Sequence, residues 1–414
     1  MRILFLTNFY PPHELGGEER SCQQVVEGLK QRGHATLVLT SMHGTNNVPV
    51  ESDGISRLLY LEMDIKPWLH SIKFFTEREK REKHNLLCLE RLLEVYKPDI
   101  VFIWGIWNLA RSLPHLAEAK CPGKVVYRFA SYWPTLPSQN HFYWQAPGRK
   151  WYSWLPKKAL GALAGALMDR ENQRQPLKFE HAICVSAATR DILVEKGIPV
   201  SRARIIHTGI DVTSYLNNNH RRLNNENLNL EMLYAGRLTA EKGVTTLFRA
   251  MAKLVKDRSL RNVRLRLAGS GLEAYEEHLR FLVAQTGLKD FVEFLGRVPF
   301  DQIPDLMRKF DVLLVPSTWQ EPFSRVVLEG MISGLVVVAT ATGGTGEILI
   351  DGDNGLLFSP GNADELAEKI AVLAADPELR QKLAHAGYQT VSKRFTSNRM
   401  LDEIEKYLDE VTII

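Results

Sequence analysis

The sequence predicts an α/β protein built from two Rossmann-like, doubly wound domains that face each other across a cleft. Three observations lead to this prediction. Short apolar runs typical of buried parallel strands alternate with helical stretches, the alternation stops at a polar segment, and it then starts again. A length of 414 residues is enough for two or three domains at about 150 residues each, and two larger ones fit the pattern best.

The first series of strands and helices begins at the N-terminus. Residues 2–8 form an apolar run, a loop with two prolines and two glycines follows, and a helix from about Glu19 to Arg32 ends at Gly33. The next strand covers residues 35–40. We expect the first domain to span residues 1–212, and its further strands lie at residues 56–61, 99–104, 124–128, 182–186 and 204–207.

A polar segment separates the two series. Residues 217–229 are rich in asparagine and contain few apolar side chains, so residues 213–229 are expected to form the linker. The second domain is expected at residues 230–395. The final segment, 396–414, contains a helix at about 398–408 that is expected to pack back on the first domain. Strands of the second domain are predicted at residues 232–235, 263–268, 291–295, 312–315 and 336–339.

Composition and charge exclude some classes of function for this chain. A hydrophobic content of 45% and a charged content of 24% are ordinary for a globular protein. The formal charge of +4 is too small to indicate a nucleic-acid partner. The four cysteines lie far apart without metal-ligand spacing, and apolar character stops at Leu6, before a signal-peptide core could form. We therefore expect a cytoplasmic protein with reduced thiols.

One stretch of the second domain, residues 312–340, contains a strand, a polar turn, a helix and a second strand. Ser324 is the expected N-cap of the helix and Gly334 its C-cap. Glu321 precedes the helix, and Glu329 lies about 7 Å further along its axis. An anionic group at the helix N-terminus, with sugar hydroxyls on both sides, would fit this spacing. The alternative is that both glutamates are solvated surface groups.

A second loop, residues 236–243, carries Arg237 and Lys242 ahead of another helix. Two cations beside a helix N-terminus can neutralise a departing diphosphate without a metal ion. The alternative is a solvated basic loop, but this loop is expected at the same sheet edge as Glu321 and Glu329. The Asp351-Gly-Asp353 segment imitates a metal-binding DxD motif, yet its context is typical of a turn. We predict neither a metal nor a cofactor.

Further motifs accompany these two loops in a fixed order. With them, the chain resembles the family-four retaining glycosyltransferases, two-domain enzymes of the GT-B fold that use nucleotide-diphosphate sugars. The matching features cover nearly the whole chain. They are Pro11-Pro12, Gly16-Gly17, residues 32–34, Val185-Ser186, residues 208–211, 236–243 and 294–296, the Glu321 and Glu329 pair, Gly343-Gly344 with Glu347, and residues 351–355.

The resemblance implies transfer of a hexose-type sugar from a UDP- or GDP-sugar to a glycan or lipid-linked acceptor, with retention of configuration. It implies that Glu321 contacts the transferred sugar and that Arg237 and Lys242 hold the diphosphate. The other residues that it implies for donor binding are Gly16, Gly17, Phe323, Ser324, Arg325, Val326 and Glu329, with the base against Arg297 and Val298.

The sequence departs from the family pattern at one place. Family members often carry a His-Asp pair after the strand at residues 124–128, and here Ala130-Ser131 stand there. The acceptor-side candidates nearby are Arg128, Ser131, Tyr132 and Trp133. This departure leaves two alternatives open: a non-catalytic protein that binds sugar nucleotides, and a GT-B epimerase or phosphorylase.

A basic, aromatic region lies in the first domain. Between residues 141 and 180 there are seven lysines and arginines and three acidic residues. Such a region suits peripheral contact with the inner face of an anionic membrane, where a lipid-linked acceptor would be found. A solvated charged face over an aromatic core remains the alternative.

Overall fold

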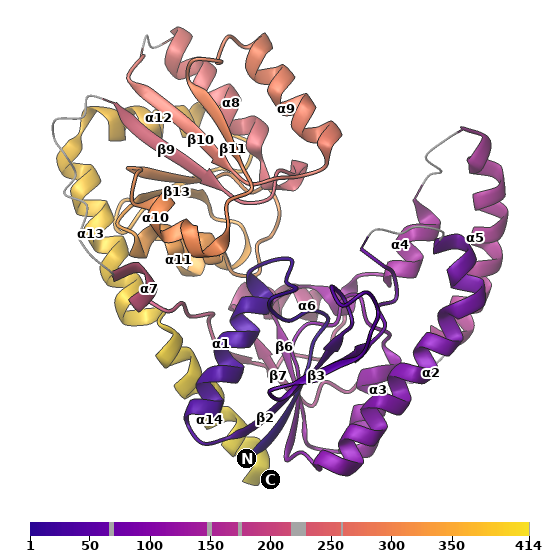
Figure 1. Ribbon diagram of the computed structural model, residues 1–414. Helices are drawn as coiled ribbons and strands as arrows, with labels where there is room; N and C mark the ends of the chain where they lie inside the picture. The colour runs from indigo at the N-terminus through magenta and orange to yellow at the C-terminus, as the bar shows by residue number, and fades with distance from the viewer. Residues whose placement is uncertain (66–69, 147–150, 173–175, 217–228, 258–259, 414) are drawn as a thin grey trace. The chain divides into compact units, whose positions relative to one another are not determined.

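The computed structural model describes residues 1–65, 70–146, 151–172, 176–216, 229–257 and 260–413. The chain divides into two compact units, each with its own sheet covered by helices (Figure 1). The first unit contains Met1–Ile206 together with Leu401–Ile414, and the second contains His207–Met400. The prediction of two doubly wound α/β domains is confirmed at the level of the individual units.

The first unit is built on an eight-stranded sheet in the order β3-β4-β2-β1-β5-β6-β7-β8. All neighbouring strands are parallel except β3, which pairs antiparallel with β4 at the edge. The inner strands are almost completely buried, as expected for strands covered on both faces. The strands are β1 (Arg2–Leu6), β2 (Ala35–Ser41), β3 (Val50–Ser52), β4 (Ile55–Leu59), β5 (Ile100–Ile103), β6 (Val125–Phe129), β7 (His181–Cys184) and β8 (Arg204–Ile205).

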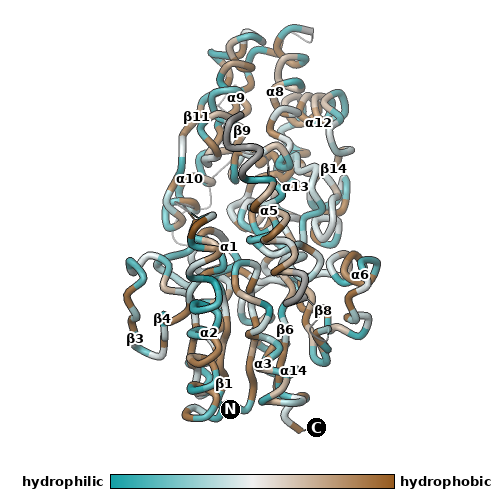
Figure 2. The backbone as a smooth tube through the Cα atoms, turned by 90° about the vertical axis from the view of Figure 1, so that its right-hand side faces the viewer, coloured by the Kyte–Doolittle hydropathy of each residue, from teal (hydrophilic) through white to brown (hydrophobic). Residues whose placement is uncertain are grey.

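The helices of this unit bury apolar stripes against the sheet. Leu89 and Leu93 of the long helix α2 join Leu113 of α3 in one core cluster with residues of β1, β5 and β6. The alternation of hydrophilic and hydrophobic residues along α2 is visible as teal and brown in Figure 2. The helices are α1 (Gly17–Gln31), α2 (His70–Tyr96), α3 (Ser112–Lys120), α4 (Gln139–Gln145), α5 (Trp151–Asn172) and α6 (Ala187–Glu195).

The second unit has a six-stranded parallel sheet in the order β11-β10-β9-β12-β13-β14. Its strands are β9 (Leu230–Ala235), β10 (Val263–Ala268), β11 (Val292–Gly296), β12 (Val312–Val315), β13 (Val336–Thr340) and β14 (Leu356–Phe358). Its helices are α7 (Thr213–Leu216), α8 (Val244–Ala252), α9 (Glu273–Gln285), α10 (Ile303–Met307), α11 (Arg325–Ile332), α12 (Ala363–Ala375) and α13 (Pro377–Arg394).

The C-terminal helix α14 (Ser397–Ile413) starts in the second unit and packs on the first from Leu401 onward. It packs closely on α1 at Gly28, where an added Cβ atom would lie 2.4 Å from Leu401 Cδ1 and would displace that side chain. Glu405 of α14 accepts hydrogen bonds from Arg32 Nη1 (2.6 Å) and pairs with His34 Nε2 (2.7 Å). These contacts attach the end of the chain to the first unit.

The unit boundaries differ from those expected. The first unit ends at Ile206, six residues before the predicted boundary at 212, because His207 and Ile210 pack with the second unit. Residues 213–216 of the predicted linker form the helix α7, whose Tyr215 is buried in the core of the second unit. Residues 217–228 lie outside the described residues. The strands β3 and β14 were not predicted; each is three residues long and lies at an edge of its sheet.

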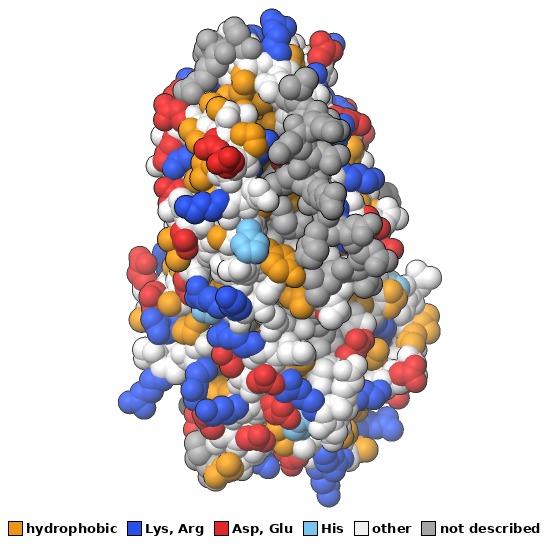
Figure 3. All heavy atoms as spheres, turned by 90° about the vertical axis from the view of Figure 1, so that its left-hand side faces the viewer, with side chains coloured by type: hydrophobic (Ala, Val, Ile, Leu, Met, Phe, Trp, Pro, Cys, Tyr) orange, Lys and Arg blue, Asp and Glu red, His pale blue; other side chains and the backbone are white. Residues whose placement is uncertain are grey.

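On the face shown in Figure 3, basic and acidic side chains are interspersed. Within the described ranges, no helix is long and apolar enough to cross a membrane.

The Glu405 contacts generate a prediction about stability and pH. Hydrogen bonds from His34 and Arg32 lower the pKa of Glu405. A carboxyl group with a lowered pKa stabilises the folded chain above the pKa of the unfolded state, about 4.3, and the stabilisation is lost as pH falls through the folded value. We therefore expect Glu405→Gln to lower the Tm at pH 7, with a difference from the parent that shrinks below about pH 4.

Circular dichroism at several pH values would measure this effect. Glu195→Gln, at an exposed position of α6, is the matched control and should leave the Tm unchanged. A Glu405→Gln Tm equal to the parent value at pH 7 would contradict the role given to these contacts.

Candidate active site

Two loops meet at the carboxyl edge of the second sheet. Because β9 and β12 are adjacent, the loop after β9, which carries Lys242, lies beside the loop after β12, which carries Glu321. Glu321 is 9% exposed, and its Oε1 atom accepts hydrogen bonds from Lys242 Nζ and from Ser317 Oγ, the latter at 2.7 Å. The structure thus joins the predicted catalytic lysine and glutamate in one ion pair.

The close approach of the two loops depends on Gly243. This residue has a φ of 68°, and a Cβ atom there would lie 1.9 Å from the carbonyl oxygen of Pro316. Nearby, the carbonyl oxygen of Glu241 accepts hydrogen bonds from the N–H groups of Thr318 (2.9 Å) and Trp319 (3.2 Å). A side chain at position 243 would therefore push the Lys242 loop away from the Glu321 loop.

A third loop supports Glu321 from the other side. The N–H group of Gly344 donates to the carbonyl oxygen of Glu321 (2.8 Å), and that of Gly343 donates to Gln320 Oε1 (2.8 Å). Thr340, at the end of β13, donates its hydroxyl to the carbonyl oxygen of Ser317 (2.6 Å). The loops after β9, β12 and β13 therefore hold Glu321 in place before any ligand arrives.

Glu329 lies on α11 and is 5% exposed. Its Oε1 atom accepts a hydrogen bond from Arg325 Nε at 2.9 Å, one helical turn earlier. Burial raises the pKa of Glu329, while Arg325 and the Tyr215 hydroxyl oppose the rise. Glu329 is therefore a buried carboxyl group with a cation beside it, and the solvated surface reading of both glutamates is wrong.

The N-terminus of α11 lies between the two glutamates in sequence. Ser324 is its N-cap, as predicted, but the Ser324 side chain makes no capping hydrogen bond. The following N–H groups, at Arg325 and Val326, are thus not covered by that side chain. Phe323 stacks on His207, with ring centroids 5.1 Å apart, which fixes the turn ahead of the helix.

The remaining donor-site candidates of the second unit follow other strands of the same sheet. Arg237 is exposed after β9, and its carbonyl oxygen accepts a hydrogen bond from the Tyr234 hydroxyl. Arg297 is exposed after β11, and Val298 beside it is half-buried. All these strands are parallel, so their carboxyl ends share one edge of the sheet.

The candidates of the first unit lie at the start of α1 and after β6. Gly16 is the N-cap of α1, Gly17 its first residue, and the Gly16 N–H donates to Glu19 Oε2 at 2.9 Å. Arg128 is only 1% exposed, and its guanidinium carbon lies 4.3 Å from the ring centroid of Trp104. Arg128 therefore lies in the interior of the unit, and its acceptor contact stays a prediction.

The other acceptor-side candidates are also mostly covered. Tyr132 and Trp133 are 5% and 3% exposed and belong to the core of the first unit, whereas Ser131 is half-buried. An aromatic pair after a strand does not show from sequence alone whether it faces the core or a ligand.

Sequence reasoning missed Glu18, which lies next to the predicted glycine pair. Burial raises the pKa of Glu18 to about 8, and the charge of Arg128 opposes this rise. Glycine at position 105 leaves room for the carboxyl group, since a Cβ atom there would lie 2.7 Å from Glu18 Oε1. The signal in the sequence was the pair Glu18-Glu19 directly after Gly16-Gly17. Ser317 and Tyr215 were missed as well. Tyr215 meets Glu329 from a distant part of the chain, whereas no motif marks Ser317, four residues before Glu321.

Comparison with known proteins gives matches over most of the chain. Residues 217–390 match the family described as glycosyl transferases group 1, and residues 15–214 match glycosyltransferase family 4. An uncharacterized glycosyltransferase of Methanocaldococcus jannaschii is 34% identical over 230 residues, which span 56% of this chain and 59% of that protein. A second one from the same organism is 24% identical over 420 residues, spanning 97% of this chain and 96% of that protein.

Solved structures share the fold. Sucrose-phosphate synthase from Thermosynechococcus elongatus aligns with a TM-score of 0.73 at 19% identity, covering 100% of this chain and 99% of that one. HepE of Anabaena, in complex with UDP and glucose, aligns with a TM-score of 0.67 at 22% identity, covering 99% of both chains.

The two units and the two family matches define a glycosyltransferase of the GT-B fold. Within that class, the chain belongs to glycosyltransferase family four.

The contact at Gly243 generates a prediction. Gly243→Ala adds a methyl group against the Pro316 carbonyl, so we expect a lower Tm and at least about tenfold weaker binding of a nucleotide sugar. Gly361→Ala is the matched control, because Gly361 has a similar φ of 77° and nothing within 4 Å of its Cβ position.

Calorimetry and thermal unfolding would separate the two effects. The control should lower the Tm by backbone strain alone and keep nucleotide-sugar binding. Equal binding by Gly243→Ala and Gly361→Ala would show that the loop contact does not shape the site.

Proposed function

We propose that this enzyme is a retaining, metal-independent transferase that moves a hexose-type sugar from a UDP- or GDP-sugar to a glycan or lipid-linked acceptor. The observation that carries the proposal is the Lys242–Glu321 ion pair, supported by Ser317, at the carboxyl edge of the second sheet. The fold shared with HepE, whose structure contains UDP and glucose, supports a nucleotide-sugar donor.

Each group of the cluster has a part in this chemistry. Lys242 and Arg237 would neutralise the charge that develops on the diphosphate as it leaves, which is the work that a metal ion does in other transferases. Glu321 would accept hydrogen bonds from hydroxyls of the transferred sugar. Its carboxylate is already held by Lys242 and Ser317, so little reorganisation accompanies the reaction.

Glu329 would bind the nucleotide half of the donor. A ribose presents two neighbouring hydroxyl donors, and a carboxylate can accept both. Arg325 keeps a positive charge next to Glu329 and so favours its ionised form despite burial. The first turn of α11, with its N–H groups, would receive a phosphate between the two glutamates.

The absence of the His-Asp pair motivates a second candidate function. Ala130 and Ser131 offer no imidazole to contact the donor sugar, and the half-buried Glu18 is one of the titratable groups near Arg128 in that unit. A protein that binds sugar nucleotides without turning them over would keep the donor site and lack transfer. A GT-B epimerase or phosphorylase is a further alternative, which the paired glutamates and the cationic loop make less favoured.

The ion pair generates a kinetic prediction. We expect Glu321→Gln and Lys242→Ala each to lower kcat for release of the nucleoside diphosphate by about 10²-fold or more, because each removes a preorganised charge from the transition state. Lys253→Ala is the matched control: it breaks another lysine–carboxylate pair of the same unit, with Asp364, away from the cluster. Near-parental kcat in both site variants would overturn the assignment.

A calorimetric panel of UDP-, GDP- and ADP-sugars would identify the donor and separate the candidate functions. A transferase binds one donor and releases its nucleoside diphosphate when an acceptor is present. A binding protein would hold the donor and release nothing with any acceptor.

We also propose that residues 141–180 contact an anionic membrane surface. In the described part of this region, Phe142, Leu160 and Leu163 are large apolar side chains with 43%, 42% and 55% exposure. Lys157 and Lys158 lie close to them in sequence. Residues 147–150 and 173–175 of the region lie outside the described residues. Apolar side chains next to lysines suit the interface of an anionic bilayer.

Vesicle flotation would test the membrane contact. Burying one leucine side chain contributes about 1.5–3 kcal/mol, so we expect Leu163→Ser to weaken binding to anionic vesicles by about tenfold or more. Leu272→Ser, at a leucine 79% exposed in the second unit, is the control and should bind as the parent does. If the protein binds anionic vesicles no more strongly than neutral ones, the membrane contact is refuted and the region is a solvated charged face.

A further inference from the structure

A cavity of about 640 Å³ lies within the first unit. Its wall includes residues that follow three parallel strands, namely Glu62 after β4, Arg111 and Ser112 after β5, and Trp133 after β6. Arg78 and Arg81 of α2 close it from another side. Other wall residues, Leu177 and Phe179 before β7 and Ile198 before β8, come from the opposite ends of parallel strands, so the cavity extends along the sheet. Its size suits a small organic molecule.

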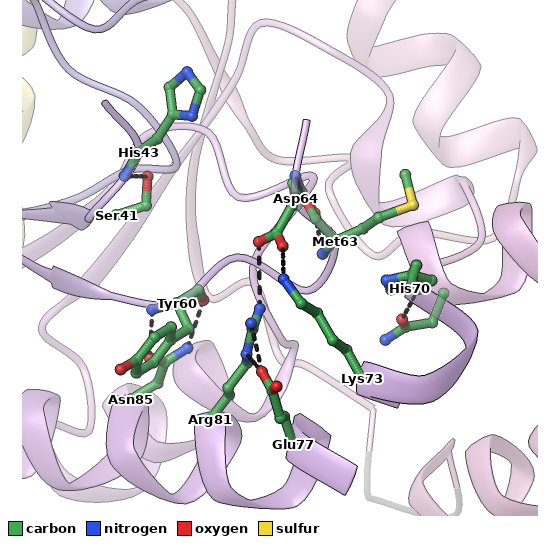
Figure 4. Close-up of polar contacts among 12 residues, drawn as sticks. Ser41, His43, Tyr60, Met63, Asp64, His70, Lys73, Glu77, Arg81 and Asn85 are labelled. Atoms are coloured by element: carbon green, nitrogen blue, oxygen red, sulfur yellow. Dashed lines mark hydrogen bonds and ion pairs between the residues drawn. The ribbon is translucent and has the colours of Figure 1, made fainter. Parts of the chain in front are cut away.

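The polar wall of the cavity is held in place by the surrounding elements. The Asn85 side chain on α2 accepts from the Tyr60 N–H and donates to the Tyr60 carbonyl, both at 2.8 Å. Arg81 and Lys73 converge on Asp64 from the same helix, as Figure 4 shows. These contacts fix the segment after β4 against α2, so the cavity is formed without a ligand.

Several buried side chains of the cavity wall are hydrogen-bond donors. Some of them donate only to neutral carbonyl oxygens, and others have no acceptor. Burial lowers the pKa of Arg111, and Glu62 opposes this shift. Arg111 donates to the carbonyl oxygens of Trp133 and Leu136, which are neutral. Ser112 Oγ and Trp133 Nε1, in residues 5% and 3% exposed, have no hydrogen-bond partner in the part of the chain that the structure describes.

Three guanidinium groups line the cavity together with the carboxylates of Glu62 and Glu82, and two histidines also line it. Of the three guanidinium groups, that of Arg81 is already paired with Asp64 and Glu77, outside the wall. The guanidinium of Arg78 packs on the Phe74 ring, 4.8 Å from its centroid. A ligand at Ser112, Trp133 and Arg111 would accept hydrogen bonds, and a negative charge on it would complement the Arg111 guanidinium, whose hydrogen-bond partners Trp133 and Leu136 offer neutral carbonyl oxygens.

The remaining wall is apolar. Leu61, Met168, Leu177, Phe179 and Ile198 line the cavity, so an organic group attached to the anion would find a nonpolar surface. A phosphate ester combines these two parts, because its oxygens accept hydrogen bonds from arginine and serine while its ester group packs against apolar side chains.

We propose that this cavity binds an organic phosphate ester, with the phosphate at Arg111, Ser112 and Trp133, and that this ester is part of the acceptor. The acceptor role rests on the proposed function, whereas the binding itself does not. A sugar phosphate and a prenyl phosphate share the chemistry that the cavity recognises.

Isothermal titration calorimetry on the full chain would test the proposal with glucose 6-phosphate and farnesyl phosphate as probes, each compared with glucose or farnesol. We expect at least one phosphate ester to bind, and its alcohol to bind at least about tenfold more weakly. Arg111→Gln should weaken that binding at least about tenfold. Arg190→Gln, an arginine of the same unit on α6, is the matched control and should bind as the parent does.

The probe that binds identifies the source of the ligand. Ser112→Ala removes a single hydroxyl and serves as the second test variant if Arg111→Gln does not fold. We expect it to weaken binding of the phosphate ester several-fold. Failure of both esters to bind, or binding that neither variant weakens, would overturn the proposal. Binding of a nucleotide sugar is measured in parallel. If the protein binds the ester in an Arg111-dependent way but binds no nucleotide sugar, the transferase function is refuted and the cavity assignment is retained.

Discussion

The ion pair between Lys242 and Glu321 is the contact on which the candidate donor site depends. The two residues are 79 positions apart, and they meet because β9 and β12 are neighbours in the second sheet. The loop after β13 completes the arrangement through the Gly344 N–H and the Thr340 hydroxyl. A buried carboxylate without partners would be costly, so the surrounding donors both allow Glu321 to be buried and fix its direction.

The first unit also places charged side chains away from solvent, in two places. Beside the glycine loop, Arg128 is buried near the half-buried Glu18, and Trp104 covers the guanidinium. In the cavity, Arg111 and its neighbours hold positive charge and unused donors in a preformed wall. Arg128 belongs to the interior of the unit, whereas the cavity is a place where an outside anion can supply the missing acceptors.

Family membership supports the donor half of the reaction more directly than the acceptor half. The family matches and the fold support a glycosyltransferase, and the donor cluster supports a nucleotide sugar. The acceptor is where chain-specific residues matter most, since Ala130-Ser131 depart from the family pattern and the cavity is lined by side chains that no family motif names.

The sequence by itself determined the two α/β units and most of their strands, and it predicted the glutamates and cations of the candidate donor site. Parallel strands covered on both faces require continuous apolar runs, and such runs are local signals. Only the tertiary structure decided that Arg128 is buried, that Tyr215 belongs to the second unit, and that residues following β4, β5 and β6 enclose a cavity. These outcomes depend on which strands are neighbours and which face a side chain takes, and neither is encoded in a short stretch of sequence.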